Sequence, residues 1–176
     1  LLFIGFSFVS QLSLIAPMLL ILAGYVKLCL VLLDFQSKSS VTNKQDTTWM
    51  LRAFALGLVG NVLFIGNTFL PLSSLAIGVT FYLYLFFIVI LVSQKMMPFF
   101  AANSIQGYVI NKSKLFVPLL CAGLVLKVIL EALSINAFVA DSFLFSLVTY
   151  ELIKWNLPFR KSPAILWVLF LSIWWV

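Results

Sequence analysis

The sequence predicts an all-α membrane protein, a polytopic transmembrane helix bundle, and three observations lead to this fold class. Of the 176 residues, 64% are hydrophobic and only 9% are charged, whereas about a quarter of the residues in a soluble domain are charged. The mean hydropathy is +1.18. Apolar runs long enough to cross a hydrocarbon core of about 30 Å alternate with short polar segments. The bilayer is therefore the expected solvent, with about six spans in one transmembrane domain, residues 1–176.

The apolar runs place the spans along the chain. The first 33 residues are too long for one span and too short for two. We therefore expect a span that begins near Ser13 and is kinked near Pro17, preceded either by the tail of a truncated span or by a turn at Ser10-Gln11. The expected spans are residues 13–33, 49–65, 75–93, 114–133, 138–155 and 164–176.

Polar residues next to the runs predict where helices begin and end. Thr47 or Thr48 is the expected N-cap of the second span, and Ser73 or Ser74 that of the third. Gly66-Asn67 is the expected C-cap and turn between them. The chain does not begin with Met and stops inside an apolar run, so we expect an internal fragment of a longer protein with incomplete first and last spans.

The cations support the same topology. The connections at residues 66–74 and 131–141 contain no Lys or Arg, and the cations flank the other three polar segments, 34–48, 94–113 and 156–163. The positive-inside rule then places these three segments in the cytoplasm. The net charge of +6 thus reflects topology, and nucleic acid is not an expected partner. The flanking cations are Lys38, Lys44, Arg52, Lys95, Lys112, Lys114, Lys154, Arg160 and Lys161.

The inventory of reactive side chains gives no support for catalysis by this segment. There is no histidine, which excludes imidazole ligands and histidine-based nucleophile activation. Cys29 and Cys121 lie in apolar runs, where cysteine usually acts as a small buried hydrophobe. No catalytic residue and no metal ligand is therefore expected. The five acids all lie near predicted helix ends or in loops: Asp34, Asp46, Glu131, Asp141 and Glu151.

Three polar residues lie inside predicted spans and are candidates for an intramembrane role. Lys27 either snorkels toward the headgroups or serves a function within the membrane. Lys127 either pairs with Glu131 at i+4 or lines a polar cavity between helices. Asn61, among small glycines, either packs helices together or contributes to a polar path.

The stretch from Ser93 to Asn103 combines a cation, a proline and two aromatic residues where the third apolar run stops. We expect Pro98 to end the helix, Lys95 to anchor it at the lipid phosphates, and Phe99 and Phe100 to dock under neighbouring helices. The segment is predicted to form a structural corner. Its critical residues are Lys95, Pro98, Phe99, Phe100 and Asn103.

Three motifs of this sequence resemble those of one known family. Lys95-Met96-Met97-Pro98-Phe99-Phe100-Ala101 is similar to the basic-residue, two-apolar, Pro-Phe-Phe-Thr segment of the NnrS proteins. Gly60-Asn61-Val62-Leu63-Phe64 resembles their Ala-Asn-Leu-Leu-Phe helix. Pro163-Ala164-Ile165-Leu166-Trp167-Val168-Leu169 resembles their Pro-Leu-Leu-Trp-Val-Leu stretch. The resemblance covers roughly residues 45 to 176.

The resemblance implies a multi-pass protein of the bacterial inner membrane, linked to haem and copper and to the response to nitric oxide or metal stress. It gives no metal ligand here, because Ile65 and Phe170 stand where the family tends to have histidine. The expected partners are the bilayer and the remaining helices of the full-length protein. The alternatives are a transporter or permease with a polar path between helices, and a structural or assembly subunit.

Overall fold

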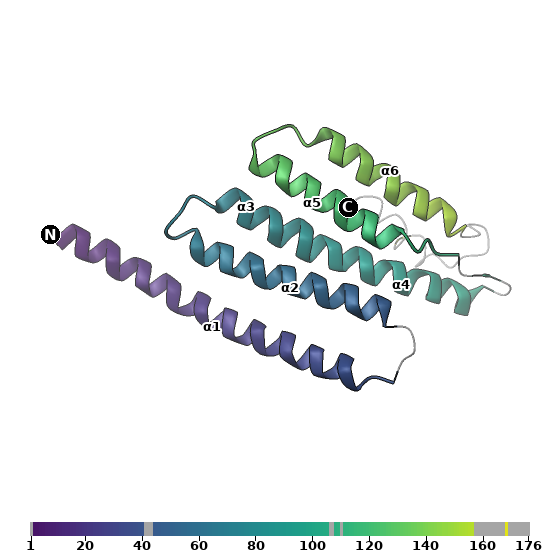
Figure 1. The fold of residues 1–176 in the computed structure, drawn as a ribbon, viewed down its shortest axis with the longest axis horizontal. Helices are drawn as coiled ribbons and strands as arrows, with labels where there is room; N and C mark the ends of the chain where they lie inside the picture. Colours follow the sequence, from purple (N-terminus) through teal and green to yellow (C-terminus); the bar gives the residue numbers. More distant parts are fainter. Residues whose placement is uncertain (1, 41–43, 106–107, 110, 157–167, 169–176) are drawn as a thin grey trace. The chain divides into compact units, whose positions relative to one another are not determined.

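The computed structural model describes residues 2–40, 44–105, 108–109, 111–156 and 168, with side chains from residue 15 onward. Within these residues the chain is helical and contains no strand, which confirms the all-α fold class. The elements are drawn in Figure 1. They are α1 (Leu2–Lys38), α2 (Gln45–Gly66), α3 (Ser73–Gly78), the π-helix η1 (Val79–Phe86), α4 (Phe87–Ser104), α5 (Phe116–Ala132) and α6 (Phe138–Lys154).

Three helical stretches of the described chain are long and apolar enough to cross a membrane: Ile15–Lys38, Gln45–Gly66 and Ser73–Ser104. The last stretch has 32 residues and runs through α3, η1 and α4 without a break. Helices α5 and α6 have 17 residues each. Six spans therefore stay a prediction, and the sixth expected span, 164–176, lies outside the described residues except for Val168.

Several expected helix boundaries differ from the structure. Helix α1 is continuous from Leu2, so there is no turn at Ser10-Gln11, and Pro17 lies inside the helix. Thr47 and Thr48 are not N-caps: they lie in the first turn of α2, and each hydroxyl donates to the Lys44 carbonyl at 2.8 Å. A threonine just inside a helix uses its hydroxyl in this way, on a carbonyl of the preceding turn.

The second helix ends where the sequence predicted, and the N-cap of the third lies one residue before the first of its two expected caps. Helix α2 ends at Gly66 with Asn67 as C-cap. The Asn67 Oδ1 accepts the Leu72 N–H at 2.9 Å and so closes the turn. Leu72 is the N-cap of α3 and makes no side-chain cap bond, so Ser73 is helical and neither Ser73 nor Ser74 is the cap.

By its contacts the chain divides into two compact units, Leu1–Tyr84 and Leu85–Val176. In the first unit α2 packs against both α1 and α3, and Figure 1 shows α1 and α2 running side by side. The buried residues of α2 are Ala53, Gly57 and Gly60, at the i, i+4, i+7 spacing of one helix face. Small residues on this face let neighbouring helices approach closely.

In the second unit α5 packs against α6 and against α4. Its interior holds large side chains, with Phe87, Leu120 and Leu124 fully buried. The connection after α5 turns through Ser134, which has a φ of 56°. The N–H of Ser134 donates to the Glu131 carbonyl and that of Ile135 to the Leu130 carbonyl, at 3.0 and 2.9 Å. This is the Schellman pattern, which satisfies the last carbonyls of a helix.

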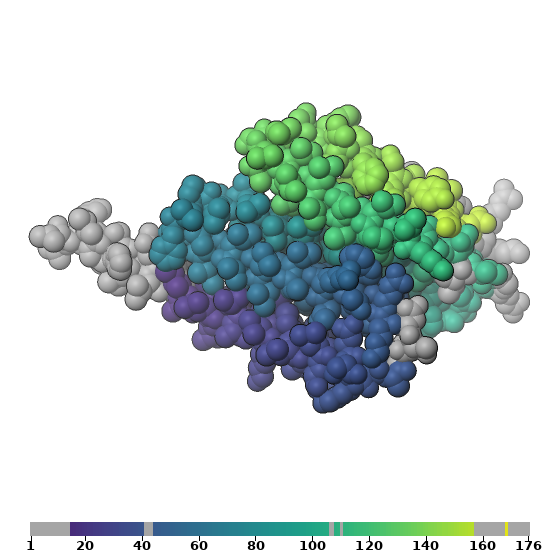
Figure 2. All heavy atoms as spheres, in the orientation of Figure 1, coloured from purple at the N-terminus to yellow at the C-terminus, as the bar shows by residue number. Residues whose placement is uncertain are grey.

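The outward faces of the helices are strongly apolar. Leu20, Phe138, Val139 and Ile153 are each at least 70% exposed, and no residue in the spanning window of α1 is buried. The side chains of α1 and α2, purple to blue in Figure 2, cover one face of the first unit. An exposed apolar surface of this extent is unfavourable in contact with water. Around apolar helices long enough to cross a membrane, lipid hydrocarbon chains contact this surface instead. The protein is therefore a membrane protein.

Candidate functional site

The second unit contains a buried carboxylate, that of Glu151, which is only 1% exposed. It projects from the inward face of α6, which also carries Leu144 and Leu152. Its Oε1 accepts two hydrogen bonds, from the Ser113 backbone N–H at 3.0 Å and from the Trp155 indole Nε1–H at 3.3 Å. Acidic residues are almost never fully buried unless they have such partners.

Two further hydrogen bonds extend this network. The Tyr108 hydroxyl donates to the Trp155 carbonyl at 2.6 Å, and the Lys154 ammonium donates to the Ser113 hydroxyl at 2.8 Å. We call these five residues, Tyr108, Ser113, Glu151, Lys154 and Trp155, the Glu151 latch. The latch ties the connection before α5 to the end of α6. Burial raises the pKa of the Tyr108 hydroxyl, because the charged form loses its solvation.

The second carboxylate oxygen, Oε2 of Glu151, makes no hydrogen bond to the described residues. Glu151 lines a cavity of about 10 Å³ together with residues of α4, α5 and α6. This volume is close to the smallest that admits a water molecule. The latch can therefore hold helices in place and accept a further hydrogen bond. The other lining residues are Ile90, Ser93, Phe116, Val148, Leu152 and Trp155.

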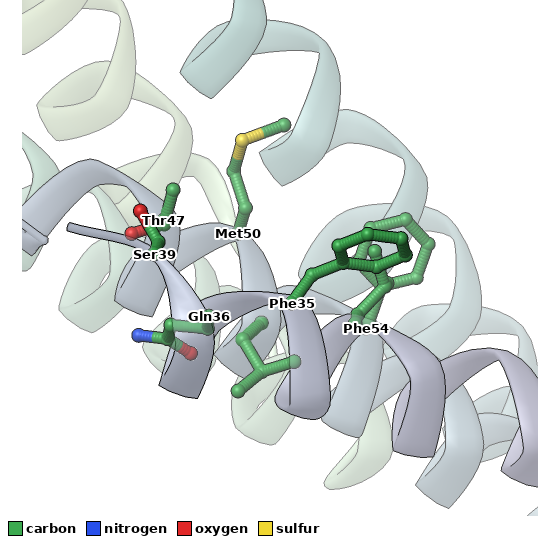
Figure 3. Close-up of a pocket in the computed structure, with 8 residues that line it drawn as sticks. Phe35, Gln36, Ser39, Thr47, Met50 and Phe54 are labelled. Carbon is green, nitrogen blue, oxygen red and sulfur yellow. The ribbon is translucent and has the colours of Figure 1, made fainter. Parts of the chain in front are cut away.

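The first unit contains a larger pocket, of about 390 Å³, between the end of α1 and the start of α2. Figure 3 shows Ser39 and Thr47 at one end of it and Phe35 beside Phe54 at the other. Its walls are mostly apolar, as is usual for ligand pockets of about 300–1,000 Å³. We call it the α1–α2 pocket. Its lining residues are Leu32, Phe35, Gln36, Ser39, Thr47, Met50, Leu51 and Phe54.

The expectation that Pro98 ends the third helix is wrong, because α4 continues to Ser104 with Pro98 inside it. A proline costs a helix one N–H bond and some strain, and packing against neighbouring elements can offset that cost. Pro98 is fully buried, in line with the buried residues Gln94 and Ala101 of the same helix face. The expected corner at Pro98 is therefore a packed helix face.

The other residues of this segment lie away from that buried face. Lys95 and Asn103 are exposed. Phe99 and Phe100 are 55% and 41% exposed, so they are not docked under neighbouring described helices. Their rings contact each other edge to face, with centroids 6.1 Å apart. This exposed edge is suited to lipid, and the functional importance of the segment stays a prediction.

The structure also shows the surroundings of the three polar residues predicted as candidates for an intramembrane role. Lys27 is exposed on α1. Asn61 donates from Nδ2 to the Gly57 carbonyl of its own helix at 3.0 Å. Lys127 pairs with Glu131 at 3.6 Å, as the i+4 spacing predicted, and also with Asp141 of α6 at 2.5 Å. Neither the Asn61 bond nor the Lys127 pairs favour a polar path between helices.

The donor set of this chain does not fit haem or a copper ion held by imidazole or thiolate. The sequence has no histidine, and the described residues contain no group of three or more His, Cys, Asp or Glu side chains that could hold a metal ion. Cys29 and Cys121 are both free thiols in different helices. Imidazole and thiolate are the ligands that haem and copper usually need.

Sequence reasoning missed the latch. It placed Glu151 near a helix end and assigned it no role. The sequence feature that could have indicated the latch is Trp155, which lies at i+4 from Glu151 on the same helix face. It also missed two buried hydroxyls in the first unit, Tyr25 and Thr80, which make no hydrogen bond of ordinary geometry to the described residues. These lie against Gly57 and Gly60, whose missing side chains leave the space they occupy.

Comparison with models of known protein families gives a match over the whole chain. The family model described as NnrS protein matches residues 1–176, the whole of the chain. No curated protein and no solved structure matches.

Proposed function

The chain belongs to the NnrS family, and we propose on that premise that it acts in the bacterial inner membrane in the response to nitric oxide and related nitrosative or metal stress. The observation that carries this proposal is the family match over all 176 residues. Three helical stretches able to cross a membrane support a multi-pass protein. The cations in alternate polar segments support an inner-membrane topology.

Within this function we propose that residues 1–176 act as scaffold and supply no catalytic group. The buried polar network, the Glu151 latch, joins the connection before α5 to α6 through hydrogen bonds. The NnrS family implies haem and copper, but the donor set described above does not fit haem or a copper ion held by imidazole or thiolate. We therefore propose that residues 1–176 provide structure and do not ligate haem.

Loss of the gene tests the proposed role directly. A host strain that lacks it should grow more slowly than its parent under a nitric-oxide donor, and at the same rate without the donor. The full-length gene supplied on a plasmid should restore growth. Equal donor sensitivity of the parent and the deletion strain, measured as growth rate against donor concentration, would show that the protein has no part in this response.

Two variants test which part of the scaffold matters. Glu151→Ala removes the shared acceptor of the latch, and the double variant Pro98→Ala, Phe99→Ala changes the Ser93–Asn103 segment. Both should complement the deletion strain poorly. Lys38→Gln, which alters an exposed cation at the end of α1, is the matched control and should complement fully. Full complementation by the Pro98 and Phe99 double variant, at equal protein level, would remove that segment from the proposal.

A further inference from the structure

The α1–α2 pocket is amphipathic along its length. Ser39 directly follows the end of α1, and Leu32 lies two turns deeper in that helix. On α2, Thr47 lies in the first turn and Phe54 two turns deeper. The helices are consecutive and packed together, so their polar residues meet at one end and their apolar residues at the other, as Figure 3 shows. The pocket therefore suits a molecule with a polar head and an apolar tail.

A cation, Lys44, is bonded to the polar end of the pocket but is not itself one of the lining residues. Lys44 is half-buried, and its ammonium donates to the carbonyl of Gln36, a residue that lines the pocket, at 3.0 Å. Lys44 is also the N-cap residue of α2, at the positive end of the helix dipole. Both the ammonium and a helix N-terminus favour an anion.

The nearby carboxylates do not neutralise the positive charge of Lys44. Asp34 is engaged by Lys38 in an exposed ion pair at 2.6 Å. Asp46 is exposed in the first turn of α2 and does not line the pocket. The membrane-crossing stretches that form the pocket end at Lys38 and begin at Gln45, so its polar end lies at headgroup depth.

We propose that the α1–α2 pocket binds one anionic phospholipid, with an acyl chain against Leu32, Leu51 and Phe54 and the phosphate beside Lys44. The apolar walls accept the chain, and Ser39 and Thr47 lie beside the glycerol and ester oxygens. Basic residues just outside a spanning helix are typical of sites for anionic lipids. This proposal does not depend on the role in nitric-oxide stress.

The experiment uses the full-length protein in nanodiscs that contain phosphatidylglycerol and phosphatidylethanolamine in equal amounts. Native mass spectrometry after release from the nanodiscs counts the lipids that stay bound. We expect one retained phosphatidylglycerol on the unaltered protein. In Lys44→Gln the retained fraction should fall about fivefold, the effect of one cation near an anionic headgroup.

Two further variants separate the pocket from general surface charge. Lys114→Gln removes an exposed cation in the second unit, away from the pocket, and should leave phosphatidylglycerol retention unchanged. Leu51→Phe fills the apolar end and should reduce retention of either lipid. Should Leu51→Phe fail to fold, the pair Lys44→Gln and Lys114→Gln still decides.

Three outcomes would overturn the proposal. They are equal retention of the two phospholipids, an equal loss in Lys44→Gln and Lys114→Gln, and preferential retention of phosphatidylethanolamine.

Discussion

In the first unit the helices approach through glycines, whereas in the second they are held apart by buried Phe, Leu and Trp side chains. A Cβ added at Gly57 would overlap the Tyr25 hydroxyl and would lie 2.8 Å from the Tyr84 ring. The second unit instead buries Phe87, Leu120 and Trp155. The first unit therefore relies on close approach of backbones, and the second on filling volume.

The polar groups differ in the same way. In the first unit the buried hydroxyls of Tyr25 and Thr80 make no hydrogen bond of ordinary geometry to the described residues, so close packing tolerates them. In the second unit Glu151 joins segments 38 residues apart in the sequence. Because lipid cannot satisfy a buried polar group, the second unit should be sensitive to loss of polar contacts and the first to added volume.

The largest effect is expected at the latch. Glu151→Ala leaves the Ser113 N–H and the Trp155 indole N–H without their acceptor, and each unpaired buried donor costs about 1–3 kcal/mol. The free energy of unfolding, measured in mixed micelles with increasing denaturing detergent, should fall accordingly. Glu151→Gln keeps an acceptor oxygen and should lose much less. Equal losses in the two variants would show that charge, and not hydrogen bonding, stabilises the latch.

Gly57→Ala tests the first unit with a single methyl group. The added carbon would displace Tyr25 and Tyr84, and overpacking of this kind costs about 1–3 kcal/mol. Gly24→Ala is the matched control, because nothing lies within 4 Å of a Cβ at that position. The same unfolding assay should show a loss at Gly57 and none at Gly24. A stable Gly57→Ala protein would contradict close approach as the basis of packing in this unit.

Tyr108→Phe is expected to have a smaller effect and a distinct pH dependence. The variant loses one hydrogen bond, to the Trp155 carbonyl, worth about 0.5–1.5 kcal/mol. The pKa of Tyr108 is raised from its ordinary value of 10.0 in the folded protein. As the pH rises, the Tyr108 hydroxyl therefore loses its proton at a lower pH in the unfolded chain than in the folded protein. The contribution of Tyr108 is therefore complete below pH 10 and declines above it.

Stability measured from pH 8 to 11 should consequently decline more steeply in the unaltered protein than in Tyr108→Phe. Parallel pH curves for the two proteins would mean that Tyr108 titrates alike in the folded and unfolded states.

The smallest effects are expected at the ion pairs near helix ends. Asp141→Asn weakens the pair with Lys127, whose side chain is 13% exposed while that of Asp141 is 49% exposed. We expect a loss of about 0.2–1 kcal/mol. Asp34→Asn breaks the pair with Lys38 in the first unit, where both partners are more exposed, and should cost less. Both losses should shrink in 0.5 M salt, and a salt-independent loss would indicate packing.

The sequence was sufficient for the fold class and for part of the topology. Hydrophobic composition and the length of the apolar runs dictate membrane helices, and Gly66-Asn67 marked the end of α2 correctly. The predicted helix end at Pro98 was wrong because a proline can lie inside a helix when packing against other elements offsets the lost hydrogen bond. Such packing depends on tertiary structure and cannot be read from the local sequence. The N-caps were misplaced because Thr47 and Thr48 have hydroxyls that bond equally well inside the first turn.

The candidate sites were less accessible to sequence reasoning. The latch depends on bonds from Tyr108 and Ser113 to residues about 40 positions later, and no periodic pattern encodes such pairings. The α1–α2 pocket arises from the shape of two packed helices, since Leu32 and Phe54 are ordinary apolar residues in the sequence. By contrast, the pair of Lys127 with Glu131 could be predicted because both lie on one helix.

The latch also has a consequence for the order in which the protein is made. Its donors at Tyr108 and Ser113 leave the ribosome well before their acceptors, since the pairs are 38 to 47 residues apart. At about 5–20 residues per second, that gap lasts roughly 2 to 10 seconds. During synthesis we therefore expect the connection before α5 to lack these hydrogen bonds until α6 has been made. A nascent chain stopped before Glu151 should be cut there by proteases that spare the finished protein.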